Sequence, residues 1–406
     1  MRSRRRRKHG GCLLVLILIT AVVVGTGLFG YLYMTGAEPS FNHVIGHHIR
    51  EDMEETAEEL PVIEQGWYYE QLDSKERAMY RVLYNGLTAG EEEIEVAESD
   101  IGLIRTIFTS MMADHPELFW LTGGSQITTY EPALGDPYAV VTAERNCTPE
   151  EQKGRSAQIE EVVGEYLSQV DTGADDYEKI KQAYDFIIDL TQYNTEADNN
   201  QNIYSVFAGH QSVCAGYAKA FQYLLKRQGI RCIYVTGKIT ENAEKHGWTI
   251  VRCHDAYYHV DVTWGDAVYN EVSEEIPSSF RAKNYDYLCC PDEVILRTHE
   301  IDETLNVPVC KADDLNYYRL HNMYYTSYDK DTFRQIIFDD VDAQKPYSVF
   351  CFADQSLYDA AHDDLTESLL HDGANRILGN TGMPHVRTLY EDEPYMFKIV
   401  IYWQYG

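Results

Sequence analysis

The chain has 406 residues, of which 44% are hydrophobic and 24% are charged, so it is long enough for two or three domains that each bury a core. Its formal net charge is −31, and the stretch "RSRRRRK" at residues 2–8 holds six of the 34 lysines and arginines. The rest of the chain is therefore even more acidic. Such a body repels polyphosphate, which argues against a nucleic acid partner.

An uncharged segment, "CLLVLILITAVVVGTGLFGYLY", follows the basic cluster. A run of this length can cross a bilayer as a helix, so we expect a basic cytoplasmic tail at residues 1–11 and one transmembrane helix at residues 12–34. The positive charges on its N-terminal side predict an extracytoplasmic location for everything that follows. A cleaved signal peptide is the alternative, but the run is longer than a usual signal region and no A-x-A cleavage site follows it.

The next part of the chain is polar and then helical in character. Residues 35–64 are typical of a juxtamembrane stalk, and residues 65–170 predict a mostly helical region. In chain order we expect a helix from Asp73 or Ser74 to about Gly86, a helix capped by Ser99 and closed by His115-Pro116, two strands between Gln126 and Cys147, and helices near residues 150–170 and from Asp175.

Residues 306–406 form a last region with an α+β pattern. The stretches "YSVFCFAD", "DAAHDDLTESLLHDG" and "MFKIVIYWQY" predict a strand, a helix and a strand. The nine cysteines of the chain form no CxxC pair, and no HExxH stretch is present. We therefore expect no metal, no cofactor and no disulfide framework.

Cys214 stands where an apolar pattern of helical period begins. Tyr217 and Phe221 continue the pattern, and Gly229 is a natural residue at the end of such a helix. Unpaired N–H groups and the positive end of the helix dipole favour a thiolate in the first turn. Gly216 could leave room there for a substrate backbone. A buried, unreactive cysteine is the alternative interpretation of Cys214, and a disulfide is the least favoured.

Two strand-like stretches, "GWTIVRC" and "YYHVDVTW", flank "HDA" and predict a β-hairpin. A turn centred on His254 and Asp255 places Trp248 opposite Asp261. His246 and Asp261 then share one face of the hairpin as diagonal neighbours. A carboxylate that holds a histidine by one ring nitrogen, while the other nitrogen faces a thiol, is the arrangement of an orienting group, a base and a nucleophile.

The stretches "SVCAGYAKAFQYLLKRQGI", "HGWTIV" and "YYHVDVTWGD" resemble the transglutaminase-like core of bacterial membrane-anchored proteins, a rearranged relative of papain-like cysteine proteinases. The resemblance implies Cys214 as the nucleophile, His246 as the general base and acid, and Asp261 as the carboxylate that orients His246. Gly247 and Thr249 stand where the usual "HAWN" motif of the family has alanine and asparagine.

The resemblance extends from about residue 65 to residue 302. It implies an α+β fold with a transglutaminase-like (papain-like) catalytic core at residues 171–305. The helical region at residues 65–170 precedes this core, and the transmembrane helix precedes both.

Further residues are candidates for binding the substrate. An oxyanion would accept hydrogen bonds from the backbone N–H of Cys214 and from one further donor, for which Gln211 and Tyr204 are candidates. Trp248 and Trp264 could line a narrow groove, with an ordinary aromatic core as the alternative.

The expected function is that of a membrane-anchored extracytoplasmic cysteine enzyme. It would form a thioester on a peptide, protein or cell-wall peptide amide, and pass the acyl group to water, as a peptidase or amidase, or to an amine, as a transglutaminase. The alternative is a catalytically silent binding module of the cell surface or cell wall on the same fold.

Overall fold

The computed structural model of the chain describes residues 66–132, 136–266 and 283–405. The expected cytoplasmic tail, transmembrane helix and stalk at residues 1–64 lie outside the described residues. None of the helices within these three ranges combines the length and the apolar character that a bilayer span requires.

The chain divides into two compact units. The first contains Leu72–Phe108 and Gly124–Ala143. Its elements are α4 (Ser74–Ala89), β1 (Ile94–Val96), and most of α5 (Ile101–Asp114), β2 (Leu121–Tyr130) and β3 (Tyr138–Arg145). The strands form an antiparallel sheet in the order β1-β3-β2, so the two strands expected between Gln126 and Cys147 are confirmed.

The ends of the helices in this unit correct two sequence predictions. Asp73 caps α4 in a capping box with Glu76, but the helix does not end near Gly86. It continues to Ala89 and ends at Gly90, whose φ of +89° suits glycine. A Cβ at Gly86 would lie 2.8 Å from the side chain of Ile94, so this glycine serves close packing.

The predicted cap of α5 is also wrong. The backbone N–H groups of Gly102 and Leu103 donate to Oδ1 of Asp100, so Asp100 caps the helix instead of Ser99. The two residues are neighbours and both are good cap residues, so the sequence pattern does not distinguish them.

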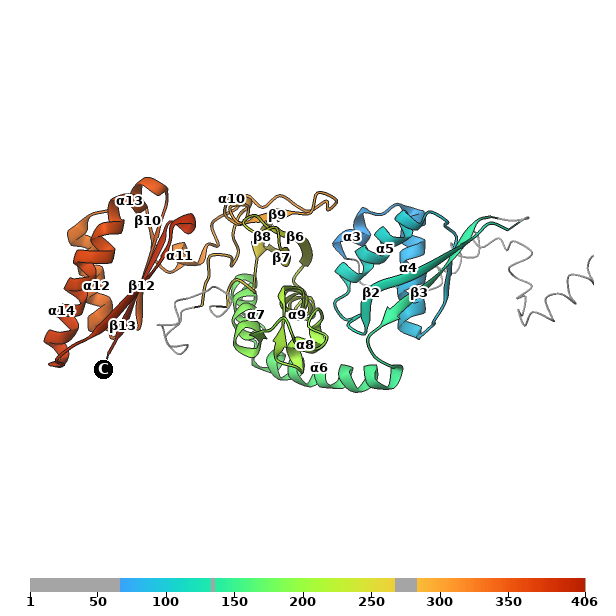
Figure 1. The fold of residues 1–406 in the computed structure, drawn as a ribbon, viewed down its shortest axis with the longest axis horizontal. Coiled ribbons are helices and arrows are strands. Elements are labelled where there is room, and N and C mark those ends of the chain that lie inside the picture. Colours follow the sequence, from blue (N-terminus) through green and yellow to red (C-terminus); the bar gives the residue numbers. More distant parts are fainter. Residues whose placement is uncertain (1–65, 133–135, 267–282, 406) are drawn as a thin grey trace, which may run out of the picture. The chain divides into compact units, whose positions relative to one another are not determined.

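The second unit contains the helices around Cys214 and a four-stranded sheet. Its helices are α3 (Trp67–Gln71), α6 (Pro149–Gln169), α7 (Asp176–Leu190), α8 (Ile203–Phe207), α9 (Cys214–Arg227) and α10 (Asp292–Ile295). Its strands are β4 (Gln192–Tyr193), β5 (Gln211–Ser212), β6 (Cys232–Ile239), β7 (Lys245–Cys253), β8 (Ala256–Val260) and β9 (His299–Ile301). The sheet has the antiparallel order β8-β7-β6-β9, and α9 packs against β6 and β7 beside α7 and α8 (Figure 1).

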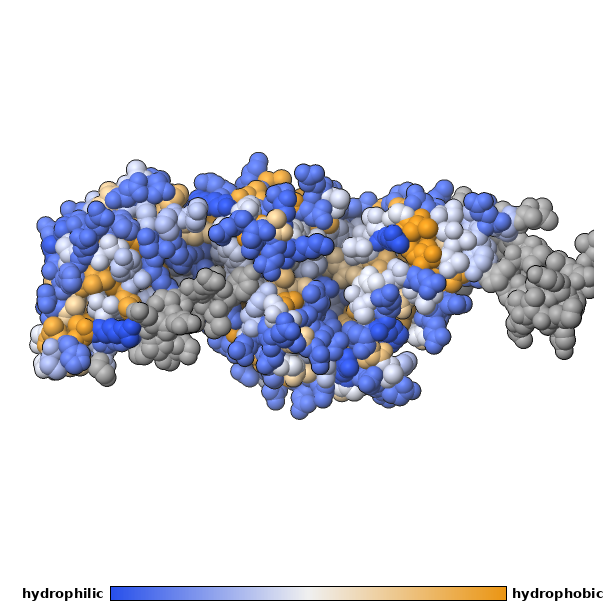
Figure 2. All heavy atoms as spheres, in the orientation of Figure 1, coloured by the Kyte–Doolittle hydropathy of each residue, from blue (hydrophilic) through white to orange (hydrophobic). Residues whose placement is uncertain are grey.

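The C-terminal part of the second unit is a second sheet with its longer helices on one face and the short helix Tyr317–Leu320 on the other (Figure 1). Its strands, in the order β10-β11-β13-β12, are Tyr324–Tyr325, Tyr347–Phe352, Lys398–Gln404 and Arg387–Glu393. Its helices are α11 (Tyr317–Leu320), α12 (Lys330–Asp342), α13 (Gln355–Asp363) and α14 (Leu369–Thr381), with the turns η3 (Asp364–Ser368) and η4 (Pro394–Met396). The predicted strand, helix and strand are β11, α13 to α14, and β13, whereas α12 and β12 were not predicted. Figure 2 shows polar residues over most of the visible face, as the net charge leads one to expect.

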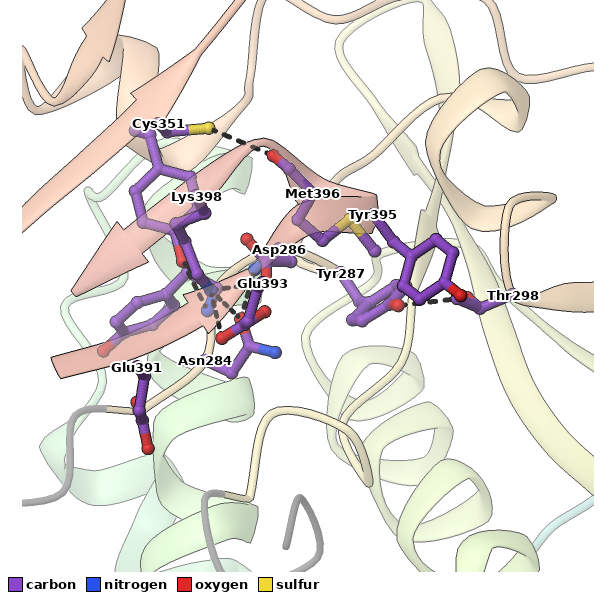
Figure 3. A network of polar contacts seen from close by, with 12 residues as sticks. Asn284, Asp286, Tyr287, Thr298, Cys351, Glu391, Glu393, Tyr395, Met396 and Lys398 are labelled. Carbon is purple, nitrogen blue, oxygen red and sulfur yellow. Dashed lines mark hydrogen bonds and ion pairs between the residues drawn. The ribbon is translucent and has the colours of Figure 1, made fainter. Parts of the chain in front are cut away.

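A buried lysine joins the C-terminal sheet to the part of the unit that holds Cys214. Lys398, on β13, is 2% exposed, and its Nζ lies 2.5 Å from Asp286 and 3.1 Å from Glu393 (Figure 3). It also donates to Asn284 and Tyr318. Burial lowers the pKa of Lys398, but the two carboxylates raise it well above its usual value. The lysine is therefore held as a cation by the acids that it pairs with.

Removing this cation should destabilise the second unit. Lys398→Met leaves Asp286 and Glu393 beside each other without their partner, and we expect the free energy of unfolding to fall by about 3–5 kcal/mol. Urea unfolding followed by tryptophan fluorescence measures the change. Lys345→Met is the control, because Lys345 is 58% exposed and pairs with Asp340, so its loss should change the free energy by less than about 1 kcal/mol. Equal effects of the two substitutions would contradict the assignment.

Candidate active site

Cys214 is the first residue of α9, as the sequence predicts. The N-cap residue, Val213, offers no side-chain hydrogen bond to the helix. The thiol is free and half-buried. The first turn therefore places a thiol beside N–H groups that no capping side chain occupies and beside the positive end of the helix dipole, both of which stabilise negative charge.

Gly216 is needed for packing within the chain, and the room for substrate that the sequence suggested at this position is not present. A Cβ there would lie 1.9 Å from Oγ of Ser212 and 3.1 Å from the carbonyl oxygen of Asn200. Ser212 in turn donates to that carbonyl over 2.8 Å. The glycine lets the first turn of α9 pack closely against the segment that precedes it.

The hairpin that presents the histidine has the register that the sequence predicts. β7 and β8 pair from Cys253 opposite Ala256 to Thr249 opposite Val260, around a turn of His254 and Asp255. The pairing stops there, because the N–H of the following residue, Asp261, donates to the carbonyl of Tyr287 over 3.0 Å. Asp261 therefore no longer pairs with β7, but its side chain lies on the same side of the hairpin as His246.

His246 and Asp261 form a buried pair. The His246 Nε2 lies 2.7 Å from Oδ2 of Asp261, and the two residues are 5% and 0% exposed. Because Nε2 is bound to the carboxylate, Nδ1 is the nitrogen left to face the thiol of Cys214, which lies close enough to His246 to affect its pKa. The structure thus brings all three predicted residues into one chain of contacts.

The electrostatic consequences follow from burial and from these partners. Burial lowers the pKa of His246, but the Asp261 carboxylate and the hydrogen bond with Cys214 raise it to about 10. Burial raises the pKa of Asp261, but His246 and His299 outweigh that effect and hold it well below its usual value. At neutral pH the pair is therefore an imidazolium beside a carboxylate, which stabilises a neighbouring thiolate.

Asp261 accepts four hydrogen bonds. Its Oδ1 accepts from the N–H groups of Thr263 and Trp264, at 2.9 Å and 3.2 Å. Its Oδ2 accepts from His246 and from Nε2 of His299, the latter at 3.1 Å. His299 was not predicted, since it lies 38 residues beyond Asp261 and no local pattern links the two.

The two predicted candidates for a second oxyanion donor have other neighbours. Gln211 is exposed on β5, where its Oε1 accepts from the side-chain amide of Asn194 over 2.9 Å. The hydroxyl of Tyr204, on α8, donates to Gln158 of α6 over 3.1 Å. The hydroxyl of Tyr204 is therefore directed at α6.

The two tryptophans differ in their surroundings. Trp248 is 0% exposed, and its Nε1 donates to Nδ1 of His259 over 3.0 Å. The suggestion that Trp248 lines a groove is therefore wrong, because the ring belongs to the core of the sheet. Trp264 is half-buried, with its ring centre 6.2 Å from that of His246, so it remains a candidate groove wall.

Two groups of side chains have the composition of metal ligands: His246, Asp261 and His299, and His259, Asp292 and Cys310. In the first group, nitrogen and oxygen are 2.7 Å and 3.1 Å apart, which are hydrogen-bond lengths, whereas ligands of one tetrahedral zinc lie roughly 3.3 Å apart. In the second, Nδ1 of His259 accepts from Trp248, so Nε2 carries the proton and donates to Asp292. Hydrogen bonding accounts for both groups.

Gly247 leaves space that a side chain would fill. A Cβ at this position would lie 2.6 Å from the hydroxyl oxygen of Tyr234, a residue of β6 that the sequence analysis did not identify. Tyr234 faces α9, where Lys219 lies over its ring at 5.3 Å. Burial is the main cause that raises the pKa of Tyr234, and the nearby Cys214 sulfur raises it further. The glycine thus admits a tyrosine beside the histidine strand.

Comparison with known proteins supports the fold of this part of the chain. Residues 165–262 match the sequence profile of the transglutaminase-like superfamily, and this span includes Cys214, His246 and Asp261. The chain therefore contains a transglutaminase-like domain, with mixed helix and sheet content. No curated protein matches the chain.

Three solved structures show a remote similarity. The crystal structure of a TGase has a TM-score of 0.25 and 15% identity, over 48% of this chain and 54% of that chain. A candidate cysteine protease from Cytophaga hutchinsonii has a TM-score of 0.24 and 12% identity, over 36% and 65%. Menin, described with its binding site for the Mixed Lineage Leukemia protein, has a TM-score of 0.24 and 12% identity, over 76% and 57%. The chain thus spans less than two thirds of each of these proteins.

The contact between Gly247 and Tyr234 can be tested by a double-mutant cycle. Gly247→Ala should lower the free energy of unfolding by about 1–3 kcal/mol, because the added methyl group overlaps the hydroxyl. Tyr234→Phe removes that oxygen, so the double variant should recover at least half of the loss. Urea unfolding measures all four proteins. Additive losses in the double variant would show that the hydroxyl is not the obstacle.

Proposed function

We propose that this chain is a cysteine acyl-transfer enzyme that acts on amides of peptides, proteins or cell-wall peptides. The observation that carries the proposal is the buried hydrogen bond between Asp261 and His246 next to Cys214, which lies at a helix start without a capping side chain. The match to the transglutaminase-like superfamily supports the same chemistry. We further propose that the enzyme is anchored by residues 12–34 with its body outside the cytoplasm, on the strength of the uncharged segment and its basic flank.

The acylation step uses each residue of the triad. The Cys214 thiolate attacks the amide carbonyl carbon, and a bond forms between sulfur and carbon while the carbonyl electrons move onto oxygen. The backbone N–H of Cys214, at the start of α9, would bind this oxyanion. When the intermediate collapses, the imidazolium of His246 donates its proton to the leaving nitrogen, and an amine or ammonia departs.

The second step regenerates the enzyme. His246, now neutral, takes a proton from water or from a primary amine, which attacks the thioester carbonyl. The carbon–sulfur bond breaks, the acyl group leaves as an acid or a new amide, and the thiolate returns to its place beside the imidazolium. Asp261 keeps the Nε2 proton of His246 fixed throughout, so Nδ1 is the nitrogen that exchanges protons with the substrate.

Selective alkylation tests whether Cys214 is activated. Iodoacetamide at neutral pH should modify Cys214 before the other thiols, because burial raises the pKa of Cys232 and raises that of Cys253 and of Cys351 to about 12. Cys214→Ala should abolish the fast phase, and His246→Ala should slow it at least about tenfold.

Cys351→Ala is the matched control and should keep the fast phase. If the folded wild-type chain shows no fast phase, Cys214 is not activated, and the chain is better described as a binding module on this fold.

Product analysis identifies the acyl acceptor. The full chain is incubated with a peptide library, with and without a primary amine, and the products are analysed by mass spectrometry. Cleaved peptides would establish a peptidase, deamidated side chains an amidase, and amine adducts a transglutaminase. We expect products of one of these kinds, which disappear in Cys214→Ala and persist in Cys351→Ala. Their absence in every reaction, despite fast alkylation, would refute acyl transfer from peptides.

A further inference from the structure

Asp261 is bound by a second histidine in addition to His246. His299 opens β9, the edge strand that pairs with β6, and its side chain is 1% exposed. Its Nε2 is directed at the same carboxylate oxygen that His246 binds. Acyl transfer at Cys214 does not itself require this second histidine, so its position needs a separate physical explanation.

The hydrogen bonds around His299 run in one direction. Because Asp261 is ionised, Oδ2 can only accept, and Nε2 of His299 must donate to it. In a neutral ring Nδ1 then accepts, and its neighbour is the Thr298 hydroxyl at 2.8 Å. That hydroxyl lies 3.0 Å from the hydroxyl of Tyr287, as Figure 3 shows. The direction is thus fixed from Tyr287 through Thr298 and His299 to Asp261, and each bond polarises the next.

Aromatic packing alone does not explain this residue. The ring of His299 lies 4.8 Å from that of Trp264, 5.1 Å from that of Trp248 and 5.5 Å from that of Tyr287. A phenylalanine would fill the same space with more apolar surface. It could not donate a hydrogen bond to a fully buried carboxylate, which would then lose one of its four donors.

We propose that His299 is a positioning residue of the acyl-transfer site, which holds the Asp261 carboxylate in the one orientation that binds Nε2 of His246. Thr263 and Trp264 fix one oxygen of the carboxylate, and the two histidines share the other. With all four donors in place the carboxylate cannot rotate without breaking several bonds at once. The inference rests on the proposed function, since the orientation of His246 matters only if Cys214 reacts.

The other titratable groups that face Asp261 do not compete with this role. They are Tyr184 on α7, Tyr287 and Cys290, all fully or almost fully buried. Burial raises the pKa of each of them well above its usual value, so they stay neutral in the range where the site would work. The Asp261 carboxylate is therefore stabilised by the imidazolium of His246 and by hydrogen bonds from His299 and from backbone N–H groups.

Nuclear magnetic resonance of the full chain with ¹⁵N-labelled histidine tests the arrangement without any turnover. We expect His299 to carry a proton on Nε2, and the Nε2 proton of His246 to resonate far downfield because it is bound to a carboxylate. Asp261→Asn should shift both signals. A neutral His299 with its proton on Nδ1 would overturn the proposal, because no proton would then be available for Asp261.

Alkylation of Cys214 as a function of pH tests the positioning role. His299→Phe should slow the reaction about tenfold at pH 7, the effect of losing one hydrogen bond to a charged group. It should also move the acid limb of the profile to higher pH, because the thiolate–imidazolium pair is less stable when Asp261 is no longer held in the orientation that binds His246. His299→Gln keeps a side-chain N–H that can reach the carboxylate, and it should restore most of the rate and of the acid limb.

His115→Phe is the matched control, as it replaces another buried histidine, whose partners are Glu117 and Lys226. It should lower stability but leave the acid limb in place, and addition of EDTA should leave every profile unchanged. A wild-type rate and acid limb in folded His299→Phe would overturn the proposal, as would equal losses in the glutamine and phenylalanine variants. Absence of fast alkylation in the wild type would instead refute the proposed function. The nuclear magnetic resonance measurement would still show whether His299 donates a hydrogen bond to Asp261.

Discussion

The site depends on one fully buried carboxylate. Asp261 has no contact with water, and a charge in that position is tolerated only if its oxygens are saturated with hydrogen bonds. Its donors come from three parts of the chain: the histidine strand β7, the turn that follows β8, and the edge strand β9. Ionisation of this group therefore requires that hairpin, turn and edge strand be assembled together. The contacts that keep Asp261 ionised are therefore the same contacts that hold this part of the fold together.

The same carboxylate decides which nitrogen of His246 does chemistry. Since Nε2 is bound to Asp261, only Nδ1 is left for Cys214, and the pKa of about 10 keeps the ring protonated at neutral pH. The thiol lies at the start of α9, where Val213 leaves the N–H groups of the first turn without a capping side chain. Most helices in the described part of the chain have a side-chain cap at their start, as Asp73 and Thr148 illustrate. An apolar N-cap stabilises α9 less than a capping side chain would. It also leaves the backbone N–H of Cys214 without competition from a capping side chain, so that this N–H can bind an oxyanion.

The sequence predicts those parts of the site that depend on local patterns. The start of α9 at Cys214 follows from its apolar period, and the pairing of β7 with β8 follows from a two-residue turn, so the side shared by His246 and Asp261 could be deduced. His299 and Tyr234 could not, because their positions depend on how β9 and β6 join the sheet. Trp248 was misjudged for a related reason: a strand tryptophan faces either a groove or the core, and only the packing of the sheet against its neighbours decides between them. Ser99 and Asp100 differ by one residue, which capping preferences do not resolve.

One connection between the C-terminal sheet and the carboxylate runs through Asp286 and Tyr287. Lys398 of β13 binds Asp286, and the adjacent Tyr287 gives its carbonyl to the N–H of Asp261 and its hydroxyl to Thr298 (Figure 3). One lysine cannot neutralise two carboxylates, and burial together with Asp286 raises the pKa of Glu393 to about 8 despite the lysine. The ion pair of Lys398 and Asp286 therefore fixes the backbone at Tyr287, whose carbonyl binds the N–H of Asp261. Like the pair of His246 and Asp261, it consists of buried charges that are stable only while both partners are present.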